Sequence, residues 1–356
     1  MILNLKKVSL RVFGVLFAAF LCFIIWPEKA YTPYEVTPEF RAAALAFNIP
    51  ALPNDWEDHK LTATDGTQIY WGQTGNRKEA KATYIMVPGY TASMSMRGDQ
   101  VTMLRARGYH VVGMDLRGQG RSERYRAEHP EKMWVDDFSI YADDVRLLIE
   151  ELDLPNDLPV ILSGSSFGGG VVTRAAGDFD LGIDGLFVLA PAYRPRTEPV
   201  SYSTVYGAAR MLRVLGKAKH FFVQQDVWQP RAKDLSQASS CSSYPARLNI
   251  GDALFVRDPA QRVGGATVQF SAEIIENADI ISAPDYTAKM TLPITMIAAE
   301  NDMAIDNAHT QGVCTGGFPN CKLVIIPGTG HCLTLENDNV LNKIWDEADA
   351  LLARII

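Results

Sequence analysis

Short apolar runs that end in Gly-, Pro- or Ser-rich loops alternate with stretches of helical periodicity, and this alternation constrains the fold more than any other feature of the chain. The pattern predicts strands over Ala82–Val87, His110–Leu116, Val160–Leu162 and Leu186–Leu189, and helices over Met94–Arg107, Asp137–Leu152 and Val171–Ala176. This order is typical of a parallel β-sheet with helices on both faces, that is, a doubly wound α/β fold. Ligand sites of such sheets lie at the carboxyl ends of the strands, so we expect the functional residues in the loops that follow these runs.

The alternation stops at residue 193 and resumes at residue 289. The intervening residues 193–288 are rich in aromatic side chains and lack the rhythm, so we expect them to form a helical cap inserted between two parts of the α/β core, 59–192 and 289–356. The second part is predicted to hold strands Ile294–Ala298 and Lys322–Ile326 and a final helix Leu335–Leu352. A hairpin with strands Leu61–Thr64 and Gln68–Gln73 around Asp65-Gly66 opens the first part. It follows a linker, residues 28–58, with a short helix over Phe40–Phe47.

The N-terminus has a different character. Lys6, Lys7 and Arg11 precede an uncharged apolar run, Val12–Trp26, which Pro27 ends. The segment has about the 20 residues that a helix needs to cross a bilayer, and the leading basic residues favour a cytoplasmic N-terminus. We therefore expect residues 1–27 to form a transmembrane signal anchor that leaves the rest of the chain periplasmic or otherwise extracytoplasmic. A cleaved signal peptide and a buried helix of a soluble domain are the alternatives.

The balance of charge and the cysteines limit the function further. The net charge is −7, and nucleic-acid binding needs a basic footprint, so no nucleic-acid partner is expected. Cys314 and Cys321 flank a turn-rich stretch, which predicts a disulfide in an oxidising compartment, and Cys241 and Cys332 are the remaining candidate pair. Four free thiols are the alternative. No spacing of cysteines or histidines fits a metal site, and no dinucleotide loop is present, so neither a metal nor another cofactor is expected.

One short motif carries nucleophilic chemistry. Residues 164–168 read G-x-S-x-G, and they follow the strand Val160–Leu162 and precede a helical run. This context predicts a nucleophile elbow, a tight turn that lifts a serine hydroxyl above the sheet. The spacing selects Ser166 as the nucleophile over Ser165. A Gly-rich turn of any doubly wound protein is the alternative reading.

A serine hydroxyl needs a base to take its proton, and the base needs an acid to orient it. Among the histidines after the strand at residue 294, which include His309, His331 alone directly follows a strand of its own, so we predict it as the base. The acid should follow the strand Ile294–Ala298, where Asp302 is the best placed and Glu300 and Asp306 are alternatives.

The reaction also needs backbone donors for the oxyanion of the tetrahedral intermediate. One is expected from the N–H of Phe167, directly after the nucleophile. The other is expected from the N–H of Tyr90, in the loop that follows the strand ending at Val87.

With these residues, the chain resembles the α/β-hydrolase superfamily and, within it, the monoacylglycerol lipase and lysophospholipase group. Residues 115–122 resemble the D-x-R-G-x-G-x-S loop of that group, residues 299–302 its acid turn, and Gly330-His331 its histidine loop. The resemblance covers roughly residues 60–356. It departs from the group's pattern at Pro88, where the group has histidine, and at Ala299, where it has glycine.

The resemblance implies a serine esterase that cleaves lipid-like carboxylic esters: lysophospholipids, phospholipids or monoacylglycerols. A basic stretch between Arg194 and Lys219 in the cap would also suit contact with a membrane surface, although a solvated helix face is the alternative. A proline iminopeptidase-like peptidase and a catalytically silent, membrane-tethered binding module remain as other functions. The oligomeric state is left open.

Overall fold

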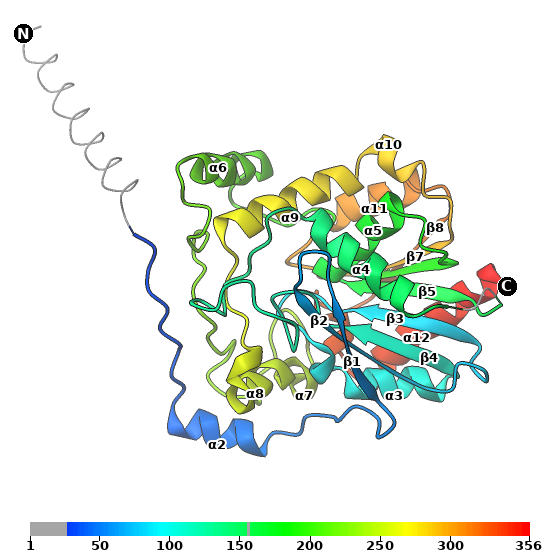
Figure 1. Cartoon of the computed structure of the whole chain (residues 1–356), viewed down its shortest axis with the longest axis horizontal. Helices are drawn as coiled ribbons and strands as arrows, with labels where there is room; N and C mark the ends of the chain where they lie inside the picture. The colour runs from blue at the N-terminus through cyan, green and yellow to red at the C-terminus, as the bar shows by residue number, and fades with distance from the viewer. Residues whose placement is uncertain (1–26, 155–156) are drawn as a thin grey trace, which may run out of the picture.

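An eight-stranded β-sheet forms the centre of the structure, a computed structural model that describes residues 27–154 and 157–356 (Figure 1). The strands are β1 (Glu57–Thr62), β2 (Gln68–Thr74), β3 (Ala82–Val87), β4 (Tyr109–Met114), β5 (Val160–Ser165), β6 (Gly185–Leu189), β7 (Ile294–Ala299) and β8 (Cys321–Ile326). Their order across the sheet is β1-β2-β4-β3-β5-β6-β7-β8. Strand β2 runs antiparallel to β1 and to β4, and the other neighbours are parallel. The predicted α/β fold with a mostly parallel sheet is confirmed.

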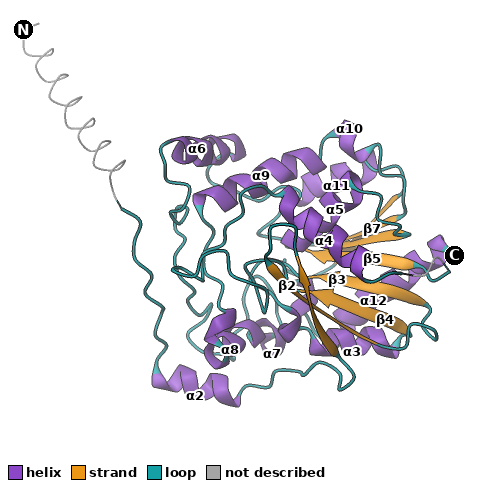
Figure 2. Ribbon diagram, viewed as in Figure 1, coloured by secondary structure: helices purple, strands orange, loops and turns teal. Residues whose placement is uncertain are grey.

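Helices cover both faces of the sheet (Figure 2). The α-helices are α2 (Pro38–Ala46), α3 (Gly98–Ala106), α4 (Ser139–Glu151), α5 (Phe167–Asp178), α6 (Tyr202–Val214), α7 (Pro245–Leu248), α8 (Ile250–Arg257), α9 (Val268–Ile281), α10 (Pro284–Thr287), α11 (Asn307–Gly316) and α12 (Asp338–Ile355). Short 3₁₀ helices are η1 (Met94–Met96), η2 (Pro259–Gln261) and η3 (Leu333–Leu335). Helices α4 and α5 lie on one face, and α3 and α12 lie on the other.

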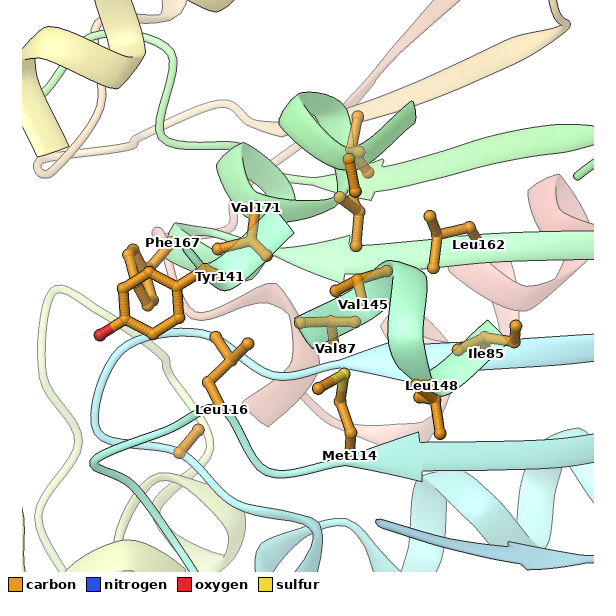
Figure 3. Close-up of a cluster of buried hydrophobic side chains, with 14 of the residues drawn as sticks. Ile85, Val87, Met114, Leu116, Tyr141, Val145, Leu148, Leu162, Phe167 and Val171 are labelled. Carbon is orange, nitrogen blue, oxygen red and sulfur yellow. The ribbon is translucent and has the colours of Figure 1, made fainter. Parts of the chain in front are cut away.

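The two faces bury two separate apolar clusters. Successive side chains of a strand point to opposite faces, so Ile85 and Val87 of β3 belong to one cluster and Tyr84 and Met86 to the other. Figure 3 shows the first cluster, where α4 and α5 cover the sheet. Because both faces of β3, β4, β6 and β7 are buried, these strands have nearly continuous apolar sequences, and such runs predict their positions.

Residues 193–288 contribute helices α6 to α10 and no strand of the sheet. Helices α6, α7 and α8 lie beyond the carboxyl ends of the parallel strands, whereas α9 and α10 run back beside the core (Figure 1). Helix α9 packs against α5 of the core, and α6 packs on the outer side of α9. Two further links join the segment to core loops: a β-bridge between Pro195 and Ile305, and one between Met133 and Ala266. The segment therefore covers the edge of the sheet at which the candidate site residues lie.

Two local expectations differ from the structure. Strand β1 begins at Glu57, earlier than the hairpin pattern indicated, because its first residues are polar and lie at the exposed edge of the sheet, where no apolar alternation marks them. The single helix expected over Met94–Arg107 is divided into η1 and α3 at Arg97. At this break the Arg97 N–H donates to the Met94 carbonyl, 3.0 Å away, which is a 3₁₀-type bond. At the start of η1 the Met94 N–H donates to the buried Asp115 carboxylate, 2.6 Å away.

The predicted membrane segment, residues 1–27, lies outside the described residues except for Pro27. Among the residues that the structure does describe, no helix is both long and apolar enough to span a bilayer.

Candidate active site

Ser166 lies at a sharp turn between β5 and α5. Its backbone has φ 51° and ψ −117°, a conformation that residues other than glycine rarely adopt. The turn projects Oγ away from the sheet. The flanking glycines make this turn possible. A Cβ at Gly164 would lie 2.3 Å from the carbonyl oxygen of Gly168, and a Cβ at Gly168 would lie 2.4 Å from that of Pro88. The two glycines of the G-x-S-x-G pattern are therefore required because the backbone passes too close to residues 164 and 168 for a side chain.

Ser166, His331 and Asp302 are joined by hydrogen bonds. His331 Nε2 lies 2.8 Å from Ser166 Oγ, and His331 Nδ1 lies 2.8 Å from Asp302 Oδ2. Asp302 is 3% exposed, and its second oxygen accepts the N–H groups of Ala304 at 2.8 Å and Ile305 at 2.9 Å. With Nδ1 donating to Asp302, Nε2 is free to accept the serine proton, which is the arrangement that a general base requires.

The rival residues have other partners. Ser165 ends β5, but the hydroxyl that reaches His331 belongs to Ser166. Glu300 accepts the N–H of Gly328 at 2.9 Å and so holds the start of the histidine loop. Asp306 caps the N-terminus of α11 by accepting the N–H of His309.

The two candidate oxyanion donors flank the nucleophile. Phe167 is the first residue of α5, where backbone N–H groups point out of the helix end. Tyr90 lies in the loop after β3, which passes directly over the elbow: a Cβ at Gly89 would lie 3.3 Å from Ser166 Cβ. The phenol of Tyr90 donates to the Gly264 carbonyl, 2.5 Å away, and thereby ties this loop to the segment above it.

Gln119 was not predicted as a site residue, yet it holds the loop that carries Tyr90, the candidate oxyanion donor. Its side chain is fully buried, accepts the N–H of Thr91 at 2.6 Å and donates to the Gly89 carbonyl at 3.3 Å. The two bonds bracket Tyr90, and Thr91 has a φ of 61°. Gln119 occupies a variable position of the D-x-R-G-x-G-x-S loop, so the signal in the sequence was the loop itself.

A cavity opens beside Ser166 and His331. It holds about 90 Å³, and its walls combine apolar side chains with two arginines. The apolar walls come chiefly from Leu189, Leu248, Ile250, Leu333 and Leu335, and the arginines are Arg97 and Arg231. None of the described residues that line this cavity is acidic.

Both candidate disulfides are present. Cys314 of α11 is bonded to Cys321 of β8, and Cys241 of the cap segment is bonded to Cys332, the residue after the candidate base. Next to the second bridge, the Cys332 N–H donates to the Cys241 carbonyl, 2.8 Å away. The histidine loop is therefore fastened to the cap by a covalent and a hydrogen bond.

The family model described as "Serine aminopeptidase, S33" matches residues 78–338, which include Ser166, Asp302 and His331. The chain belongs to this family of α/β hydrolases. The resemblance read from the motifs is thus confirmed, and the chain is a serine hydrolase.

Relatives of this hydrolase include a probable lysophospholipase and monoglyceride lipases. "Probable lysophospholipase L2" of Haemophilus influenzae is 24% identical over 270 residues, which are 75% of this chain and 82% of the relative. Monoglyceride lipase of Mus musculus is 24% identical over 303 residues, 83% of this chain and 90% of the relative. The crystal structure of a soluble variant of monoglyceride lipase from Saccharomyces cerevisiae superposes with a TM-score of 0.65 at 16% identity and covers 87% of this chain and 99% of that one.

Proposed function

We propose that this hydrolase cleaves carboxylic esters of lipid-like substrates through an acyl-enzyme on Ser166. The observation that carries the proposal is the continuous hydrogen-bonded chain from Asp302 through His331 to Ser166. A catalytically silent binding module, the alternative raised from the sequence, has no need for an aligned base or for an acid held by two backbone N–H groups.

The geometry suits two-step acyl transfer. His331 Nε2 removes the Ser166 proton while Oγ attacks the ester carbonyl, and the N–H groups of Phe167 and Tyr90 stabilise the oxyanion that forms. The C–O bond to the alcohol then breaks, and the imidazolium returns its proton to the leaving oxygen. In the second step His331 takes a proton from water, the resulting nucleophile attacks the acyl-enzyme, and the carboxylic acid leaves as Ser166 recovers its proton.

The walls of the cavity favour an ester over a peptide. The family name refers to aminopeptidases, and an aminopeptidase needs carboxylates to hold the substrate's ammonium group. The described residues that line this cavity include two arginines and no carboxylate. Lysophospholipase and monoglyceride lipase relatives support the same choice.

A lipid would occupy the site only in part. The cavity of about 90 Å³ is smaller than the roughly 300–1,000 Å³ of sites that enclose a drug-sized ligand. The scissile ester and the groups next to it would fill this space, and a long acyl chain would extend beyond it or require movement of the cap.

The decisive test of this function uses matched serine variants. Hydrolysis of lysophospholipid, phospholipid and monoacylglycerol is measured for the wild type, Ser166→Ala and Ser165→Ala. We expect Ser166→Ala to abolish turnover of every substrate, and Ser165→Ala to retain it. Full esterase activity in Ser166→Ala would reject the proposal, and cleavage of N-terminal proline peptides in preference to all esters would favour the peptidase.

We also propose that the enzyme acts outside the cytoplasm, anchored by residues 1–27. Both disulfides support this location because such bonds persist in oxidising compartments. Protease added to intact spheroplasts is expected to degrade the catalytic domain. Resistance of the domain, with degradation after lysis, would contradict the outward-facing topology.

Helix α6 is the part of the cap that we propose lies on the membrane surface. Its inner side packs on α9, where Tyr202 donates to Asp279 and Tyr206 to Glu276. Its outer side exposes Met211 and Val214, which are 56% and 87% accessible, beside the exposed Arg210. Apolar side chains flanked by arginine suit an anionic lipid interface.

A protein that lacks residues 1–27 tests this surface by flotation with vesicles that contain anionic lipid. Met211→Glu/Val214→Glu is expected to weaken binding, while Ile280→Glu, at another exposed apolar position, should not. Equal binding of all three proteins would contradict the role of α6.

A further inference from the structure

Arg97 presents an unpaired charge to the active-site cavity. It follows η1, is only 5% exposed and lines the cavity beside Ser166. Its Nη1 is buried without a hydrogen-bond partner, and no side-chain hydrogen bond or ion pair joins it to the residues that the structure describes. Burial lowers the pKa of Arg97 to about 10, so the guanidinium still carries its charge near neutral pH. Buried charges without a partner are costly, and such a group is a candidate for ligand binding.

The carboxylates near Arg97 are already bound elsewhere. Asp99 accepts from Arg247 and from the Gln100 N–H. Asp115 accepts the N–H groups of Met94 at 2.6 Å and Arg121 at 2.9 Å, one on each oxygen. These carboxylates lower the cost of keeping Arg97 charged, but neither occupies its donors.

A second arginine stands at the mouth of the same cavity. Arg231 is exposed and lies close enough to Arg97 for their charges to repel. Its guanidinium makes a 3.4 Å contact with Thr91 Oγ1, next to the candidate oxyanion donor Tyr90. Asp252 lies near Arg231, but its oxygens accept from Trp228 Nε1 and from the Arg231 backbone N–H.

Resting on the proposed function, we propose that Arg97 and Arg231 form an anion subsite that binds a phosphate on the alcohol part of the ester. Two guanidinium groups in a cavity wall without carboxylates can make several charge-assisted hydrogen bonds to phosphate oxygens. A fatty acyl chain carries no charge, whereas the glycerol part of a lysophospholipid carries a phosphate. The enzyme therefore prefers lysophospholipids to monoacylglycerols.

Two short, soluble esters isolate this charge. Monobutyrin and 1-butyryl-glycerol 3-phosphate share the acyl group and the glycerol, differ only in the phosphate, and avoid effects of micelles or membranes. For the wild type we expect a kcat/KM for the phosphate ester at least about 10-fold above that for monobutyrin, as for one or two charge-assisted bonds. Free butyrate serves as a competing inhibitor to detect a subsite that instead binds the carboxylate product.

The variants Arg97→Met, Arg97→Lys and Arg231→Gln locate the effect. Arg97→Met is expected to lower kcat/KM for the phosphate ester by about 10- to 100-fold, with less than about a threefold change for monobutyrin. Arg97→Lys should restore part of the preference. Arg231→Gln, a change at an exposed position that leaves the core intact, should lower it by about three- to tenfold. Arg41→Gln, at an exposed position of α2, removes the same charge away from the cavity and should change nothing.

The outcomes separate this inference from the function on which it rests. Equal kcat/KM for the two esters in the wild type, or an equal loss on both in Arg97→Met and Arg231→Gln, would overturn the phosphate subsite while leaving the esterase intact. Butyrate inhibition that disappears in Arg97→Met, without a phosphate preference, would overturn it in favour of a product carboxylate site. Failure to hydrolyse either ester would instead contradict the proposed function.

Discussion

Replacing Gln119 by methionine tests how the oxyanion loop is held. The substitution keeps the length of the side chain and removes the bond to the Thr91 N–H at 2.6 Å and the bond to the Gly89 carbonyl at 3.3 Å. Each such bond contributes about 0.5–1.5 kcal/mol net, so the loop loses about 1–3 kcal/mol of support for the conformation that directs the Tyr90 N–H at the oxyanion.

If all of that support is needed in the transition state, kcat falls by about 5- to 150-fold, since about 1.4 kcal/mol corresponds to a factor of ten. The upper limit is the roughly 10²–10³-fold cost of losing one oxyanion donor outright. The value of KM should change by less than about threefold, because the ground-state carbonyl depends little on this donor.

Steady-state hydrolysis of p-nitrophenyl butyrate, with circular dichroism to verify folding, measures both constants. Gln269→Met is the matched control: Gln269 is also a buried glutamine, with bonds to the Asp136 carbonyl and to Glu273, but it does not line the cavity. A folded Gln119→Met enzyme with unchanged kcat, or an equal loss in Gln269→Met, would refute the reasoning.

Three further perturbations test the orientation of the base, the bridge beside it and a buried histidine. Asp302→Asn should lower kcat for ester hydrolysis by about 10³–10⁴-fold, because the imidazole loses the acceptor that fixes its tautomer. A loss below tenfold would contradict that role. Cys241→Ser/Cys332→Ser removes a disulfide that closes a loop of 91 residues and should lower the free energy of unfolding in urea by about 4–5 kcal/mol. Cys314→Ser/Cys321→Ser removes one that spans 7 residues and should lower it by about 2 kcal/mol. Equal losses would contradict the dependence on loop length. Burial lowers the pKa of His110 to about 4 in the folded protein, whereas an unfolded histidine has a pKa of about 6.5. The unfolded state therefore binds more protons between these two pH values, and the free energy of unfolding should fall as the pH drops from about 6.5 to 4. An equally steep fall in His110→Gln would exclude His110 as its source.

The parallel strands and the residues of the candidate triad could be predicted because the signals lie in short stretches of sequence. Strands such as β3 are buried on both faces and so appear as unbroken apolar runs, and Ser166 is marked by glycines that the turn requires at fixed offsets. Asp302 and His331 each follow a strand, so the order of the strands predicts where they meet.

The parts that could not be predicted depend on contacts between distant residues. Gln119 acts through the loop at residues 89–91, about 28 positions away, and no local pattern marks that pairing. The bridge between Cys241 and Cys332 joins the cap to the histidine loop, and four cysteines alone allow three pairings. Arg97 lies within a stretch predicted to be one helix, and its unpaired charge becomes evident only once the partners of Asp99 and Asp115 are known.

Labelling with a fluorophosphonate, followed by peptide mass spectrometry, tests the central claim most directly. The account predicts that the probe modifies the peptide that contains Ser166, at Ser166 itself, in the wild type and in Ser165→Ala. It predicts no labelling in Ser166→Ala, and strongly slowed labelling in a folded His331→Ala variant, because Ser166 is a good nucleophile only when His331 takes its proton. Modification of Ser165, or undiminished labelling without His331, would contradict the assignment of Ser166 as the nucleophile and His331 as its base.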